Sequence, residues 1–365
     1  MKFECVREKI VDVLVKASRV TSKNLTLPIL QCVLLVAKEN TLTVKSTNLD
    51  LGFEFVLPVK VIKEGVIAVP AGILTSYISG ISQERNITCE SDENTLKIVT
   101  SKGSTSIKLF PYNDFPLIPI VGKEHTLSIN SQDLVTGLKS VTWAASTTSI
   151  KPELSSVYIY PAKSGICFVA TDSFRLAEKV LPLKSPNFPP ILVPHKNIQE
   201  IIHIFDGVHT AVELHIAKNQ VAFIAEHLYL MSRVVDGSFP DYQKIIPQSG
   251  TTEVTILRHD LLQTLRLANI FMDKWSQVEF LVEPKKKKLE IRSRNTDVGE
   301  LKENLNGSLS GEEVTVRFSY KYVIDCLSTI ATDSITLYFN GADRALMIRG
   351  VGDASFTYIV MPMNR

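Results

Sequence analysis

The sequence contains no long uninterrupted apolar run. No stretch of its 365 residues approaches the roughly 18 apolar residues that a membrane-spanning helix needs, and Val33–Ala37 has only the length of a strand. The segment Met1–Glu8 is charged and lacks the apolar core of a secretory signal. These absences predict a protein without a membrane span or an export signal, and we expect it to reside in the cytoplasm.

Cysteine is scarce and is not spaced for metal binding. The five cysteines are odd in number, widely separated and free of Cys-x-x-Cys pairs, which argues against a zinc site and a disulfide framework. A free cysteine among apolar neighbours behaves as a small buried hydrophobe, and a reducing compartment keeps it so. Four cysteines have such neighbours: Cys5, Cys32, Cys167 and Cys326.

Motifs with a known catalytic mechanism are also missing. The sequence has no phosphate-binding Gly-x-x-x-x-Gly-Lys-Ser/Thr, no Gly-x-Gly-x-x-Gly, no Gly-x-Ser-x-Gly and no His-Glu-x-x-His. The six-residue spacing of His203, His209 and His215 matches no compact metal motif, so we interpret them as surface histidines around a turn. Asp172 and Arg175 have the spacing of a turn or a structural ion pair. We therefore predict no catalytic residues, no metal and no cofactor.

The charge balance is nearly even. Lysine and arginine number 40 against 38 acidic residues, so the net charge is only +2, and any contact with nucleic acid must come from local clustering. The run Lys285–Lys288 lies between two strand-like segments. It favours a solvated hairpin tip over a DNA contact.

The sequence contains an internal repeat, in which one unit occurs three times. Strand-like openings followed by a helical apolar pattern occur at Phe3, Leu127 and Val254, which lie 124 and 127 residues apart. The composition, with 45% hydrophobic and 21% charged residues, is typical of packed globular domains. We place the three domains at residues 1–122, 123–249 and 250–365.

Two helices are predicted in each copy, with about eight strands around them. The first helix carries apolar residues in an i, i+1, i+4, i+7 stripe, and the second begins after Pro70, after Pro194 or at Ser319, the expected N-cap of the third copy. Both helices should cover one face of an extended sheet, which makes the fold class α+β. The stripes are Ile10, Val11, Leu14 and Ala17; Leu134, Val135, Leu138 and Val141; and Leu261, Leu262, Leu265 and Ala268. Equivalent turns are expected at Thr47-Asn48, Thr171-Asp172 and Thr296-Asp297.

Five short stretches spread over the whole chain are Thr26–Leu30, Val69–Ala71, Ala170–Asp172 with Arg175–Ala177, Asp236–Tyr242 and Met361–Met363. They resemble motifs of the bacterial DNA polymerase III beta subunit, the beta sliding clamp family. Each is weak alone, but five in order on a threefold repeat are specific.

The resemblance implies a processivity factor rather than an enzyme. Such a protein is a non-catalytic subunit of a DNA-directed DNA polymerase, a nucleotidyltransferase. It forms a head-to-tail homodimeric ring that encircles duplex DNA, with the helices lining the hole and the sheets outside. One alternative is a DNA-processing enzyme on the same fold, which the lack of metal-binding acids disfavours. Another is a repeat-built scaffold without DNA, which helix charge and dimer closure would distinguish.

Basic residues on or beside the helices are the expected DNA contacts, since phosphates attract positive charge without reading sequence. Ordinary solvated helix faces remain an alternative for each one. The candidates are Arg7, Lys16, Arg19, Lys23, Lys139, Lys151, Lys196, Arg258, Arg266 and Lys321.

The resemblance also implies a hydrophobic groove for short peptides of the polymerase III alpha subunit, the clamp loader delta subunit and other replication and repair proteins. Phe174 stands where relatives often have histidine, and core packing is the alternative for Ile245 or Ile359 alone. The groove candidates are Leu154, Thr171, Ser173, Phe174, Arg175, Leu176, Pro240, Lys244, Ile245, Ile359, Met361, Pro362 and Met363. Ile107, Ile270 and Phe271 are the expected subunit contacts.

Overall fold

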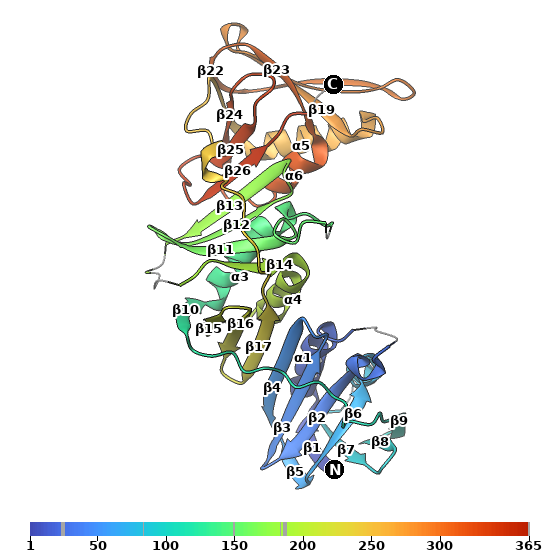
Figure 1. The fold of residues 1–365 in the computed structure, drawn as a ribbon. Helices are drawn as coiled ribbons and strands as arrows, with labels where there is room; N and C mark the ends of the chain where they lie inside the picture. Colours follow the sequence, from blue (N-terminus) through green and yellow to red (C-terminus); the bar gives the residue numbers. More distant parts are fainter. Residues whose placement is uncertain (23–25, 83, 149, 183, 185–187, 364–365) are drawn as a thin grey trace. The chain divides into compact units, whose positions relative to one another are not determined.

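A computed structural model describes residues 1–22, 26–82, 84–148, 150–182, 184 and 188–363 (Figure 1). The chain forms two compact units, and each is described by itself. One consists of Met1–Val135, Pro186–Pro189 and Lys196–Val234, and the other of Thr136–Ser185, Pro190–His195 and Val235–Arg365.

The expected pattern of two helices and about eight strands occurs in each copy. The first copy has α1 (Arg7–Arg19), α2 (Ala71–Gly80), β1 (Lys2–Val6), β2 (Cys32–Lys38), β3 (Thr41–Thr47), β4 (Leu51–Pro58), β5 (Lys60–Lys63), β6 (Gly65–Pro70), β7 (Asn86–Ser91), β8 (Thr95–Thr100) and β9 (Gly103–Lys108). The second has α3 (Ser131–Val141), α4 (His195–Phe205), β10 (His125–Asn130), β11 (Ser156–Ala162), β12 (Gly165–Thr171), β13 (Arg175–Leu181), β14 (Ile191–Pro194), β15 (Ala211–Ala217), β16 (Gln220–Ala225) and β17 (Leu228–Arg233).

The third copy repeats this order. It has α5 (Arg258–Ala268), α6 (Tyr320–Leu327), β18 (Thr252–Leu257), β19 (Gln277–Glu283), β20 (Lys288–Asn295), β21 (Gly299–Leu305), β22 (Gly307–Gly311), β23 (Val314–Ser319), β24 (Ser334–Phe339), β25 (Leu346–Gly350) and β26 (Phe356–Val360). Short 3-10 helices follow α3 and α5, and others lie in loops. The prediction of a triplicated α+β fold is therefore confirmed.

The sheets continue from one copy into the next. In the first unit, an eight-stranded sheet runs in the order β10-β15-β16-β17-β4-β3-β2-β6, so β17 of the second copy pairs with β4 of the first. In the second unit, a nine-stranded sheet runs β14-β11-β12-β13-β26-β25-β24-β18-β22, and β13 of the second copy pairs with β26 of the third. The remaining sheets are β5-β1-β7-β8-β9 and β21-β20-β19-β23. Main-chain pairing thus connects copies that the sequence pattern presents as separate.

The apolar stripes of the first helices are confirmed in the second copy and are shifted in the other two. Val13 and Thr264 are buried, whereas Val11 and Leu262 are only half-buried. In these two helices the buried side chains stand at i, i+3, i+4 and i+7, not at the predicted i, i+1, i+4 and i+7. Residues three apart lie on one face of a helix with 3.6 residues per turn, whereas adjacent residues do not. Ser319 stands at the N-cap of α6 as expected, but its side chain makes no capping hydrogen bond.

The repeated turns of the first two copies are built from equivalent hydrogen bonds. Thr47 Oγ1 donates to the carbonyl of Leu51 at 2.6 Å, and Thr171 Oγ1 donates to that of Arg175 at the same distance. Each hydroxyl also accepts the amide two residues on. In the third copy the corresponding acceptor is Asn295, not Thr296, so the predicted equivalence of Thr296-Asp297 was wrong by one residue.

The predictions for cysteine and histidine have different outcomes. The five cysteines are free and buried. His215, expected at the surface, is buried on β15 with Nε2 at 3.0 Å from Glu213. It pairs across the sheet with Ala222, which packs against Val121, and this packing covers that face of the strand. Among the described residues, no helix is long and apolar enough to span a membrane and no acidic, histidine and cysteine cluster could hold a metal.

Candidate functional site

The hairpin between β12 and β13 carries the centre of the expected groove. The Asp172 carboxylate accepts the amides of Phe174 and Arg175 at 2.9 and 3.0 Å, and Thr171 Oγ1 accepts that of Ser173 at 3.1 Å. Ser173 has φ 79°, a left-handed conformation that short polar residues tolerate in turns. These bonds fix the turn and direct the Phe174 side chain outward.

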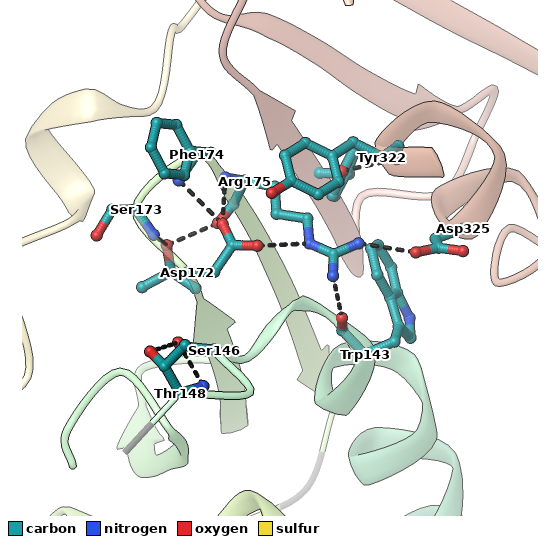
Figure 2. A network of polar contacts seen from close by, with 11 residues as sticks. Trp143, Ser146, Thr148, Asp172, Ser173, Phe174, Arg175, Tyr322 and Asp325 are labelled. Carbon is teal, nitrogen blue, oxygen red and sulfur yellow. Dashed lines mark hydrogen bonds and ion pairs between the residues drawn. The ribbon is translucent and has the colours of Figure 1, made fainter. Parts of the chain in front are cut away.

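Arg175 is the hub of this region (Figure 2). Its Nε donates to Asp172 Oδ2 at 3.0 Å, its Nη1 to Asp325 Oδ2 at 2.8 Å and its Nη2 to the carbonyl of Trp143 at 2.6 Å. Asp325 lies on α6, and Trp143 follows α3. One guanidinium therefore connects the second copy to the third. The predicted ion pair with Asp172 is confirmed.

Aromatic rings complete the enclosure of Arg175. Its guanidinium lies 4.5 Å from the ring centre of Tyr322 and 5.4 Å from that of Trp143. Burial alone would lower the pKa of Arg175, but the hydrogen bond to Asp325 and the nearby carboxylates raise it. Because only 8% of the side chain is exposed, Arg175 orders the β12–β13 turn from within, and its guanidinium is largely out of reach of a ligand.

The C-terminal segment joins this turn directly. The Met361 amide donates to the carbonyl of Phe174 at 2.8 Å, and β26 before it pairs with β13. Phe174 is 62% exposed, Ile245 59% and Met361 41%. We call these three exposed side chains the apolar rim of the expected groove.

A buried floor supports the rim. Leu176 on β13 lies opposite Ile359 on β26, and both pack with Tyr242. The Tyr242 hydroxyl donates to Glu178 at 2.5 Å and meets Tyr160 at 2.7 Å. Burial, followed by the charges of Cys167 and Glu178, raises the pKa of Tyr242, so this hydroxyl stays a donor.

The expected groove residues therefore fall into two classes. Exposed or half-buried are Ser173, Phe174, Pro240, Lys244, Ile245, Met361, Pro362 and Met363. Buried are Leu154, Thr171, Arg175, Leu176 and Ile359. Lys244, at the rim, pairs with Asp241 at 2.6 Å, and both side chains are exposed.

Two of the expected DNA contacts hold helices together. Arg7, the first residue of α1, donates to the carbonyls of Ile78 and Ser79 at the end of α2, at 3.2 and 2.9 Å. Arg258, the first residue of α5, donates to those of Leu327 and Thr332 at 3.2 and 3.1 Å. Each guanidinium thus connects the start of the first helix of its copy to carbonyls at or after the end of the second helix.

The other basic candidates differ in their surroundings. Lys16 pairs with Asp12 at 3.0 Å, and Arg19 pairs with Glu200 at 2.7 Å. Lys23 lies outside the described residues. Exposed side chains belong to Lys139, Lys151, Lys196, Arg266 and Lys321.

The expected subunit contacts are also divided. Ile107 is buried on β9, where it faces Leu96 of β8, whereas Ile270 is exposed and Phe271 is half-buried.

Sequence reasoning missed Trp143, Tyr322 and Asp325, which surround Arg175. Asp325 is a polar residue next to the apolar stripe of α6, and no sequence spacing relates it to Arg175.

Solved structures define the class of fold. The DNA polymerase sliding clamp of Bacillus subtilis matches with a TM-score of 0.94 at 24% identity, covering 100% of this chain and 99% of that one. A sliding clamp of Pseudomonas aeruginosa, solved bound to griselimycin, matches with a TM-score of 0.94 at 22% identity over 100% of both chains. This chain has the sliding-clamp fold.

Sequence comparison gives the family. Models of the N-terminal, central and C-terminal domains of the DNA polymerase III beta subunit match residues 1–119, 128–241 and 243–364. Beta sliding clamps of Synechococcus elongatus and Bacillus subtilis are each 25% identical over 100% of this chain and cover 99% and 100% of their own lengths. The chain belongs to the DNA polymerase III beta subunit family, as the five motifs predicted.

Proposed function

We propose that this protein is the processivity factor of a replicative DNA polymerase, a non-catalytic homodimeric ring that encircles duplex DNA in the cytoplasm. The observation that carries the proposal is the match of the three domain models, in order, along one chain. The proposed domains are residues 1–122, 123–249 and 250–365.

Head-to-tail closure gives the open sheet edges a partner. β9 ends the five-stranded sheet of the first unit, and β21 ends the four-stranded sheet of the second. Exposed strand edges invite uncontrolled association unless they are paired or covered. A heterologous contact that closes after two subunits would pair each β9 with the partner's β21, next to Ile270 and Phe271.

Contact with DNA is proposed to be weak and independent of sequence. Exposed lysines and arginines on the helices supply salt-dependent attraction to phosphates, and the closed ring supplies retention. Lys196 on α4, Arg266 on α5 and Lys321 on α6 are exposed and are assigned this role. Arg7 and Arg258 contribute mainly by orienting the helices.

The peptide groove is proposed at the rim of Phe174, Ile245 and Met361 above the floor of Leu176 and Ile359. Flexible methionine and exposed aliphatic side chains suit a surface that repacks around several partners. Its ligands would be short apolar segments of the polymerase III alpha subunit, the clamp loader delta subunit and other replication and repair proteins.

Topological retention is tested by loading the protein onto nicked circular DNA with a clamp loader and then cutting the circle. Bound protein should leave the linear DNA and remain on the uncut circle. Retention after linearisation, or a monomer in sedimentation at micromolar concentration, would contradict the ring.

The groove is tested by anisotropy with a labelled C-terminal peptide of the polymerase III alpha subunit. Met361→Ala should weaken binding while sedimentation still reports a dimer. Leu117→Ala, which changes an exposed apolar residue in the first unit, is the control and should leave binding unchanged. Equal affinities of wild type and Met361→Ala would exclude this groove.

A further inference from the structure

One face of the four-stranded sheet β21-β20-β19-β23 carries a row of charged side chains. Arg317 on β23 pairs across the sheet with Glu279 on β19, which pairs with Arg292 on β20, which pairs with Lys302 on β21. The row therefore holds three cations and one anion. Side chains at directly opposite positions of neighbouring strands lie on the same face and interact.

The single carboxylate of Glu279 is shared within the row. It accepts from Arg317 Nε at 2.8 Å and from Arg292 Nη1 at 3.4 Å. Arg292 also pairs with Glu290, and Lys302 pairs with Glu300 at 2.7 Å. Arg292 and Lys302 stand directly opposite each other, each with its own carboxylate partner.

A hollow of about 650 Å³ opens over this row. Arg294 also lines it, so four cationic side chains surround the space together with the carboxylates of Asp273, Glu279 and Glu300. Among the described residues, Arg317 hydrogen-bonds through its Nε, and Arg292 hydrogen-bonds through its Nε and Nη1. The remaining guanidinium N–H groups are donors in the planar geometry that carboxylates match.

The hollow continues toward the proposed peptide groove. A second hollow of about 400 Å³ is lined by the same Glu279 and Arg317, together with Val316 and Met363. The Met363 amide donates to the carbonyl of Arg317 at 2.8 Å. Met363, two residues after Met361, thus lies beside the charged row.

We propose that the charged hollow binds acidic side chains that flank the apolar motif of a partner peptide. The inference rests on the proposed groove and assigns it a second, electrostatic part. A peptide seated on Met361 needs only to continue past Met363 to bring a carboxylate to Arg317, Arg292 and Lys302. Glu279 and Glu300, standing among the cations, suit separate carboxylates better than a continuous run of phosphates.

The test uses synthetic peptides with the apolar tail of the polymerase III alpha subunit, extended at either end by a short run of glutamates or of glutamines. Binding is measured by anisotropy at low and high salt. The variant Arg294→Gln with Lys302→Gln removes two exposed cations of the hollow. Its matched control, Lys285→Gln with Lys287→Gln, removes two exposed cations from the β19–β20 turn of the same sheet.

For wild type we expect one glutamate peptide to bind about threefold to tenfold more tightly than its glutamine counterpart, an advantage that salt removes. The hollow variant should lose this advantage and keep its affinity for the glutamine peptide, and the control should keep both. Equal affinity of wild type for both peptides overturns this inference alone. No binding of either peptide overturns the groove itself. If the hollow variant forms a weaker dimer in sedimentation and binds both peptides as wild type does, the hollow contacts the second subunit and the inference is overturned.

Discussion

Arg258 makes in the third copy the contact that Arg7 makes in the first. Each begins the first helix of its copy and donates two hydrogen bonds to carbonyl groups at or after the end of the second helix. In the second copy, Ser131 begins α3, and its hydroxyl donates to the carbonyl of Val208 after α4 at 2.6 Å. In all three copies, the first residue of the first helix therefore connects the two helices. This residue is arginine in the first and third copies and serine in the second.

Arg258→Met should lower the free energy of unfolding by about 1–3 kcal/mol, because two half-buried carbonyls lose their donor. Arg266→Met, on the exposed face of the same helix, should change it by less than about 0.5 kcal/mol. Urea denaturation compares the two. Equal stabilities of both variants would show that the contacts of Arg258 do not hold α6.

Arg175→Met should be more damaging, with a loss of about 3–5 kcal/mol, because it leaves the carboxylates of Asp172 and Asp325 without their buried partner. The methionine keeps much of the side-chain volume, so the loss reports the charge network rather than a cavity. Lys244→Met removes an exposed ion pair and should leave the denaturation midpoint unchanged. If both variants unfold at the same urea concentration, Arg175 is not the hub of this region.

Phe174→Ala should weaken peptide binding about tenfold or more, because an exposed aromatic at the centre of a contact surface is a typical anchor. Its thermal midpoint should match that of wild type, since the side chain is mostly exposed in the free protein. Phe174→His restores a flat ring and should recover part of the affinity. Full affinity in the alanine variant would place the peptide elsewhere.

Lys196→Gln and Lys321→Gln should weaken contact with DNA without changing stability, because both side chains are exposed. Each lost phosphate contact should reduce the slope of log affinity against log salt by about 0.9. Binding of the unloaded protein to short duplexes over a salt series measures the slope. Gln132→Ala, which changes an exposed position of α3 without loss of charge, is the control. An unchanged slope in both lysine variants would remove these residues from the DNA-facing surface.

The cysteine thiols should be unreactive in the folded protein at pH 8. Burial raises the pKa of Cys32 from 9.0 to about 11, so its protonated form is favoured in the native state. Its contribution to stability is complete below pH 9 and is lost as the pH rises from 9 through 11. A thiol-specific disulfide reagent should titrate five groups in denaturant and none rapidly without it. Rapid reaction of a native thiol would contradict the burial.

The sequence alone determined the repeat, the two helices of each copy and the hairpin turns of the first two copies, because these depend on spacing within a few residues. The hydroxyl of Thr171 and the carboxylate of Asp172 organise their turn through bonds that span at most four residues. The burial of the cysteines was likewise predicted from their apolar neighbours in the sequence. The motifs at Val69–Ala71 and Met361–Met363 indicated the family, because each consists of neighbouring residues and their order along the chain can be read from the sequence.

Only the tertiary structure decided which residues meet across the copies. Asp325 reaches Arg175 across 150 positions of sequence, and His215 is buried because the segment containing Val121 packs over its sheet. Sequence periodicity records which face of an element is apolar, but not which distant element covers it. For the same reason Arg7 and Arg258, which read as exposed cations, proved to be bound to the ends of neighbouring helices.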